Sequence, residues 1–135
     1  MSIASHLFVG SPEEASRNDG LEGGPDERRA VFYRVMDTGL APLFRIIVGQ
    51  QCPSFEPKAM SDDFDVITFA FPVAFTNALA GFDNATFDDT VSKWISDPEC
   101  PYGNTNDLRE LLTALVRLAV TAKSDQYDLY LWNCI

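Results

Sequence analysis

Histidine is scarce in this 135-residue chain, which contains only His6. A Ser-His-Asp triad or a site with several histidine metal ligands would depend entirely on that residue. Ser11, in Val9-Gly10-Ser11-Pro12, lacks the G-x-S-x-G spacing of a nucleophile turn, and Gly20, Gly23 and Gly24 match neither glycine-rich nucleotide fingerprint. We therefore predict no catalytic, cofactor-binding or metal-binding residue, and we expect that the protein is not an enzyme.

The sequence is also poor in cysteine and has no long apolar run. Cys52, Cys100 and Cys134 form an odd set at irregular spacing, which favours reduced thiols over a disulfide framework. Near the start the apolar run is only Leu7-Phe8-Val9, and no Lys or Arg precedes it. Neither a signal peptide nor a membrane span is predicted, and the expected location is the cytoplasm.

Basic residues are outnumbered two to one. Twenty Asp and Glu against ten Lys and Arg give a net charge of −10. Such a surface repels phosphate backbones and anionic lipids, so we expect neither direct nucleic-acid binding nor membrane binding. Two interpretations of the charge stay open: it keeps the protein soluble, or it steers the protein toward a basic partner protein.

The first half of the chain alternates between predicted strands and helices. Residues 5–9 predict a strand, and Ser11-Pro12-Glu13-Glu14 supplies the cap, proline and glutamate of a helix start. Breakers across 18–27 predict a mobile loop. Residues 29–36 favour a strand, although a helical stripe fits them too, and Leu40 to Val48 has the spacing of a buried helix.

The second half is dominated by helices. Residues 50–65 predict a loop because of Pro53, Pro57 and the acids that follow, and Val66 to Phe71 predicts a strand. Helices are expected over 72–79, from about 86 to 96, and from about 107 to 123. A closing strand spans Tyr127 to Ile135. These elements predict one α+β domain over residues 1–135, with a sheet of three to four strands covered by about five helices.

Acidic residues gather in two of the predicted loops. Asp62, Asp63 and Asp65 lack the glycine and glutamate positions of an EF-hand, so a solvated loop is favoured over a cation site. Asp97 and Glu99 lie in the loop 97–104. Other acids occupy helix starts, where they favour the positive end of the helix dipole; these are Glu13, Glu14, Asp88, Asp89 and Asp107.

Aromatic residues offer a second kind of interface signal. Tyr and Trp are common anchors in protein interfaces, although core packing is the favoured interpretation for most of those in this chain. The four candidates are Tyr102, Tyr127, Tyr130 and Trp132.

A family resemblance rests on three local features: a helix that contains Trp94, a leucine-rich helix from Leu108, and the closing strand Leu129-Tyr130-Leu131-Trp132. With the small size and the acidic charge, they make the chain resemble the α/β immunity proteins that bacteria keep in the cytoplasm to neutralise toxins. The resemblance implies a protein-binding inhibitor that covers the active or substrate-binding surface of a basic toxin. The expected contact residues are Asp62, Asp63, Asp65, Asp97, Glu99 and Tyr102.

Two other functions stay open. A phage or plasmid inhibitor that mimics nucleic acid would carry carboxylates spaced like phosphates on one exposed face. A small hydrolase or metal-dependent enzyme with clustered aspartates would need several of them to converge in one concave pocket.

Overall fold

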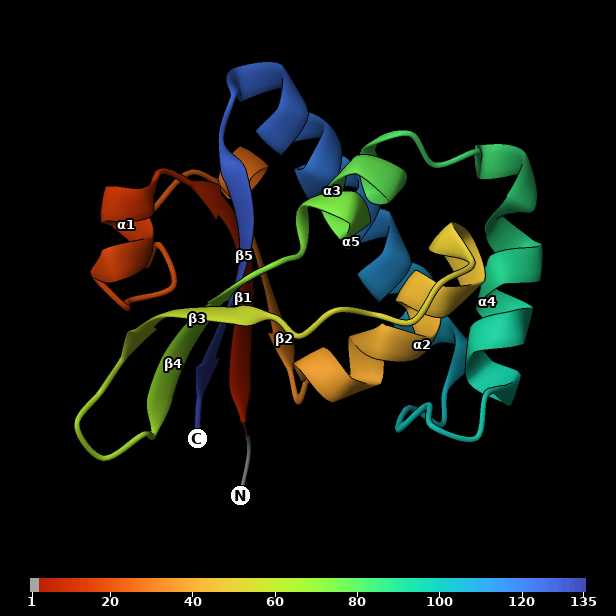
Figure 1. The fold of residues 1–135 in the computed structure, drawn as a ribbon, viewed down its shortest axis with the longest axis horizontal. Coiled ribbons are helices and arrows are strands. Elements are labelled where there is room, and N and C mark those ends of the chain that lie inside the picture. Colours follow the sequence, from red (N-terminus) through yellow and green to blue (C-terminus); the bar gives the residue numbers. More distant parts are fainter. Residues whose placement is uncertain (1–2) are drawn as a thin grey trace.

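The computed structural model describes residues 3–135, which form one antiparallel sheet of five strands and five α-helices (Figure 1). The order across the sheet is β2-β1-β5-β4-β3, and every neighbouring pair is antiparallel. The strands are β1 Ala4–Gly10, β2 Arg29–Tyr33, β3 Glu56–Met60, β4 Val66–Ala70 and β5 Asp128–Cys134. The helices are α1 Pro12–Ser16, α2 Asp37–Val48, α3 Val73–Ala80, α4 Phe87–Ser96 and α5 Thr105–Asp125, with short 3₁₀ turns η1 Asp26–Arg28 and η2 Asn84–Thr86.

The main core lies between one face of the sheet and the helices α2, α3, α4 and α5 (Figure 1). Strand β5 contributes Leu129 and Leu131 to this core, and the leucines of α5 pack over them. Because side chains alternate along a strand, Tyr130 and Trp132 project from the opposite face. The central strand is therefore apolar on both sides, as its sequence predicts.

The opposite face is covered by α1 and the segment that follows it. Phe8 and Tyr130 stack at 5.1 Å, and with Ala15 and Leu21 they form a second small core. The Asn18 side chain donates to the Val66 carbonyl and accepts from the Thr68 hydroxyl. The segment 18–27, which the sequence predicts to be mobile, is thus fastened to the sheet at several points, and its mobility in solution stays a prediction.

The α+β class is confirmed, but the predicted number of strands is too small. Strand β3 falls inside the expected loop 50–65, because Pro57 and the nearby acids have the composition of a loop. Proline is tolerated in an edge strand, where its missing N–H faces solvent. The register shift between Pro57 and Ala59 accommodates it. The segment 29–36, for which the sequence leaves helix and strand open, is a strand over 29–33.

Local signals place the helix ends close to their predicted positions. Ser11 and Glu14 form the capping box at α1, and Gly49 ends α2 in the left-handed conformation at φ +80°. Helix α5 begins two residues earlier than predicted, because the Asn104 side chain accepts hydrogen bonds from Asn106 and Asp107. Within residues 3–135, no helix combines the length and the apolar character needed to cross a membrane.

Candidate functional site

Three of the predicted contact residues come together at the turn between β3 and β4, which we call the acidic tip and define as residues 61–65. The tip is a hydrogen-bonded turn: Ser61 donates its N–H to the Val66 carbonyl at 2.8 Å, and Val66 returns its N–H to the Ser61 hydroxyl at 3.0 Å. The carboxylate of Asp63 accepts from the Ser61 hydroxyl and from the Asp65 N–H. These bonds hold the pKa of Asp63 below its usual range, with the Ser61 hydroxyl as the largest cause.

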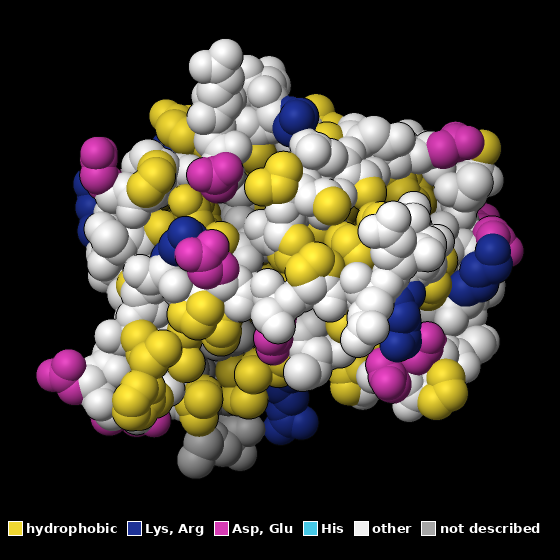
Figure 2. Space-filling model, viewed as in Figure 1, with side chains coloured by type: hydrophobic (Ala, Val, Ile, Leu, Met, Phe, Trp, Pro, Cys, Tyr) yellow, Lys and Arg dark blue, Asp and Glu magenta, His cyan; other side chains and the backbone are white. Residues whose placement is uncertain are grey.

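An aromatic side chain stands among these carboxylates. Phe64 is 62% exposed and adopts a φ of +62°, in the left-handed region that bulky residues rarely occupy. Its N–H donates to the Ser61 carbonyl at 3.0 Å, which fixes the turn. Met60 and Ile135 are also exposed, and the Ile135 N–H donates to the Asp65 carbonyl, so the C-terminal residue lies beside the tip. Figure 2 shows apolar side chains gathered over this hairpin, with carboxylates at its margin.

The loop 97–104 differs from the tip in that its predicted contact residues have partners inside the molecule. Arg45 pairs with Asp97 at 3.1 Å and with Glu99 at 3.0 Å. The ring of Tyr102 packs edge-on against Trp94 at 6.0 Å, and burial raises the pKa of the Tyr102 hydroxyl to about 12. These three residues fasten α4 and its loop to α2 and to the core.

The structure does not bring the two acidic loops together. The acidic tip projects from one end of the molecule, whereas the loop between α4 and α5 lies at the other end (Figure 1). A partner that contacts the tip over a standard interface need not reach Asp97 or Glu99. The site expected from the sequence therefore separates into the exposed tip and a second group that is bonded to Arg45 or packed on Trp94, of which Glu99 remains exposed.

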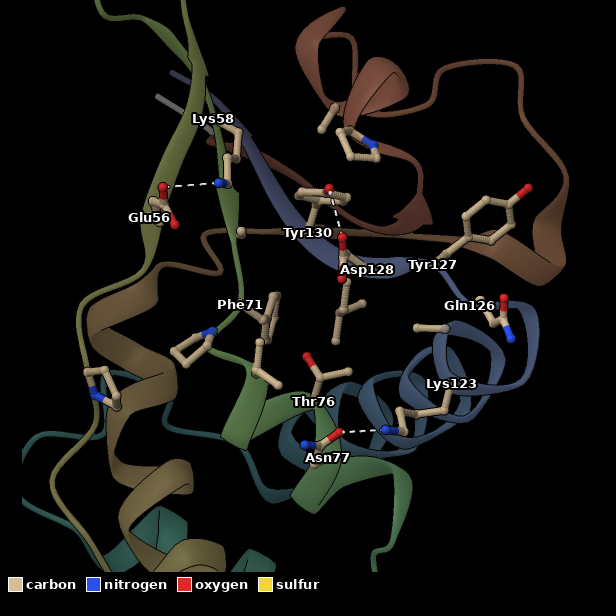
Figure 3. Close-up of a pocket in the computed structure, with 18 of the residues that line it drawn as sticks. Glu56, Lys58, Phe71, Thr76, Asn77, Lys123, Gln126, Tyr127, Asp128 and Tyr130 are labelled. Atoms are coloured by element: carbon tan, nitrogen blue, oxygen red, sulfur yellow. Dashed lines mark hydrogen bonds and ion pairs between the residues drawn. The ribbon is translucent and has the colours of Figure 1, made fainter.

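A groove of about 850 Å³ lies between α1, the start of β3, the N-terminal end of α3 and the C-terminal end of α5. Phe71, Leu129 and Tyr130 line it with apolar surface. On one side Lys58 pairs with Glu56 at 3.0 Å, and on another Lys123 donates to the Asn77 amide oxygen at 2.9 Å (Figure 3). The groove is therefore an apolar channel with charged groups at its rim.

Tyr130 brings a polar hydroxyl group to the lining of the groove. Its hydroxyl lies 3.5 Å from a carboxylate oxygen of Asp128. Burial and the negative charge of Asp128 raise the pKa of Tyr130 to about 12. The hydroxyl is therefore protonated at neutral pH, so it acts as a hydrogen-bond donor and not as a base.

The remaining reactive side chains lie away from the groove. His6 lies on the sheet face that carries α1, with its ring 4.5 Å from Trp132 and its Nδ1 3.1 Å from the Gly20 carbonyl oxygen. Burial raises the pKa of the Cys52 thiol, which disfavours the reactive thiolate. In the part of the chain that the structure describes, no three His, Cys, Asp or Glu side chains are arranged to hold a metal ion. The aspartates of the acidic tip lie on a projecting turn and not in the groove.

Sequence reasoning identified Tyr127 and Tyr130, which line the groove, as candidate anchors, but it did not identify the groove itself. It also missed Phe64. A single aromatic residue in an acidic loop carries no periodicity, so only the turn geometry shows that its ring is exposed. Comparisons with protein-family models, curated proteins and solved structures found no match to this chain.

Proposed function

We propose that this protein is a protein-binding inhibitor of the immunity type, which acts in the cytoplasm by inserting its acidic tip into the basic substrate cleft of a toxin. The observation that carries the proposal is Phe64, an exposed aromatic ring held on a hydrogen-bonded turn between Asp63 and Asp65. Interfaces commonly use an aromatic anchor surrounded by polar groups that exclude water.

The energetics of the tip favour binding. Burial of a phenylalanine side chain contributes roughly 1.5–3 kcal/mol, and a turn that is already ordered loses little conformational entropy on association. The three carboxylates of the tip would add electrostatic steering toward a basic surface, which chiefly accelerates association. The tip thus combines an anchor, a rigid support and a charge.

The groove supports a second contact on the same partner. Strand β3 connects the two features, because Glu56 and Lys58 line the groove and Met60 precedes the tip. An extended segment of the toxin with apolar side chains would fit the channel over Phe71 and Tyr130 while the tip occupies the cleft. Both contacts would then block entry of the substrate.

Co-expression with the product of the neighbouring gene tests this function. We expect the chain to rescue growth from a toxic neighbour and to form a complex that weakens as salt increases. Phe64→Ala should reduce the affinity roughly tenfold or more. Val120→Ala, which truncates an exposed apolar side chain on α5, is the matched control and should bind normally. Absence of both rescue and complex would refute the inhibitor function, and an unaffected Phe64→Ala complex would refute the role of the tip.

A further inference from the structure

The two edges of the sheet differ in how they are protected. Edge strands expose unpaired N–H and C=O groups, and proteins usually block them with proline, lysine or a bulge. Strand β3 has all three devices, in Pro57, Lys58 and the register shift between Pro57 and Ala59. Strand β2 pairs with β1 in an unbroken register and contains neither proline nor lysine. The β2 edge is therefore the one that is competent to pair.

The open backbone groups of β2 belong to two residues. Arg34 donates its N–H to the Ile3 carbonyl at 2.8 Å, so the alternation of an antiparallel ladder turns residues 30, 32 and 34 toward β1. Val31 and Tyr33 consequently direct their N–H and C=O groups away from the sheet. The backbone groups of Arg29 also point away from β1, but they are already hydrogen-bonded. The Arg29 N–H donates to the Asp26 carbonyl, and the Arg29 carbonyl accepts from Arg117 at 3.5 Å.

The side chains of the same two residues are exposed. Ala30 and Phe32 pack toward the main core, whereas Val31 and Tyr33 project from the opposite face and are 49% and 67% exposed. An exposed Val and Tyr on an unblocked edge is the combination that invites strand addition. One strand thus presents open hydrogen-bonding groups and uncovered apolar surface together.

We propose that β2 is the interface with a second copy of this chain, in which two β2 strands pair antiparallel about a two-fold axis at Phe32. This register places Val31 of each copy opposite Tyr33 of the other, as a hydrogen-bonded pair that exchanges both N–H···O bonds. The pairing satisfies every open N–H and C=O of Val31 and Tyr33. It also forms a β-branched and aromatic cross-strand pair on each side of the axis, an arrangement that stabilises sheets.

The charge of the chain bears on the strength of this association. Each chain has a net charge of −10, so two copies repel each other, most strongly at low ionic strength. The interface consists mainly of two short strands and is smaller than the roughly 1,600 Å² of a standard one, so the dimer is expected to dissociate on dilution.

Sedimentation analysis from micromolar to near-millimolar concentrations tests the dimer. Val31→Pro removes an N–H that points away from β1, so the five-stranded ladder is kept while the intermolecular bond is lost. Tyr33→Lys places a charge on the same edge without changing the backbone. Met60→Lys makes the equivalent change on the protected edge and is the control. We expect the natural chain and Met60→Lys to dimerise, and Val31→Pro and Tyr33→Lys to remain monomeric with unchanged circular dichroism.

Amide hydrogen exchange provides a second readout that is independent of the variants. In the natural chain, the amides of Val31 and Tyr33 should be protected at high concentration and should lose that protection on dilution. A chain that is monomeric throughout, or a dimer that persists in Tyr33→Lys, would overturn the proposal. Neither outcome depends on the toxin, so failure here is distinguishable from failure of the proposed function.

Discussion

At the scale of single residues, the acidic tip combines an unusual backbone conformation with exposure. Phe64 has positive φ, is largely exposed and has its N–H bonded within the turn. A left-handed conformation costs a residue with a side chain roughly 1–2 kcal/mol relative to its right-handed form. The turn therefore holds an aromatic ring where glycine or asparagine would be less strained. This cost is consistent with a role of the ring in binding.

Substitution of Phe64 should separate stability from binding. Phe64→Gly relieves the strain at positive φ and adds disorder to the unfolded chain, so the free energy of unfolding should stay unchanged or rise by up to about 1 kcal/mol. Phe64→Val puts a β-branched residue at the same position and should lower it by about 1 kcal/mol. Urea unfolding of both variants is the measurement. A larger loss for glycine than for valine would show that the ring packs against the fold.

Glu14 should make the stability depend on acid pH. Burial raises its pKa, but the Ser11 N–H and the Arg28 guanidinium outweigh burial and hold the pKa below its ordinary 4.5. A lowered pKa in the folded state stabilises the protein above pH 4.5, and this contribution disappears as pH falls through the folded-state pKa. Glu14→Gln keeps the shape of the cap but loses the charge and the ion pair with Arg28.

A comparison of Glu14→Gln with the natural chain shows whether the charge of Glu14 stabilises the fold. At pH 7 the variant should be less stable by about 1 kcal/mol, and the difference should shrink below pH 4.5. Urea unfolding at both pH values measures it. An equal difference at the two pH values would mean that the charge of Glu14 contributes nothing.

At the scale of elements, one side chain supplies two of the hydrogen bonds that attach the segment after α1 to the sheet. Asn18 bridges the segment to β4 through the Val66 carbonyl and the Thr68 hydroxyl, and its own carbonyl accepts from the indole N–H of Trp132 at 2.8 Å. Thr68 is fully buried, so its hydroxyl has no alternative partner in water. The attachment of the whole segment to the sheet thus relies on a few polar contacts and on Leu21.

Asn18→Ala should loosen this segment selectively. The change leaves the buried Thr68 hydroxyl without its acceptor, which costs about 1–3 kcal/mol of unfolding free energy. Hydrogen exchange should accelerate over 18–27 and not in α5, which packs on the other face of the sheet. Thr113→Ala, which removes an exposed hydroxyl bonded within α5, is the control. Unchanged exchange across 18–27 would show that the remaining contacts, such as Leu21 and the Trp132 bond to the carbonyl of residue 18, hold the segment without the Asn18 side chain.

At the scale of the whole molecule, the sheet is covered unequally. The helical layer of α2, α3 and α5, with α4 packed outside it, covers one face, whereas α1 and its following segment cover only part of the other (Figure 1). The exposed apolar side chains Val31, Tyr33 and Phe64 lie on the two outer strands or in the turn that follows one of them. The proposed contacts with a toxin and with a second copy therefore use opposite edges of one sheet and do not compete.

The sequence by itself determined the elements whose signals are local. Hydrophobic spacing predicts α5, the Ser11 and Glu14 pair predicts α1, and the apolar run after Tyr127 predicts a strand covered on both faces, because each signal depends on residues adjacent in the chain. The α+β class followed from their order.

Only the tertiary structure decided which exposed residues can form a site. It made β3 a strand by giving Pro57 an edge position, paired Asp97 and Glu99 with the distant Arg45, and packed Tyr102 against Trp94. It also left Asp62, Asp63 and Asp65 exposed around Phe64. Both loops are acidic, with Asp62, Asp63 and Asp65 in one and Asp97 and Glu99 in the other. The distinction between them arises from contacts between residues far apart in the chain, which no local pattern encodes.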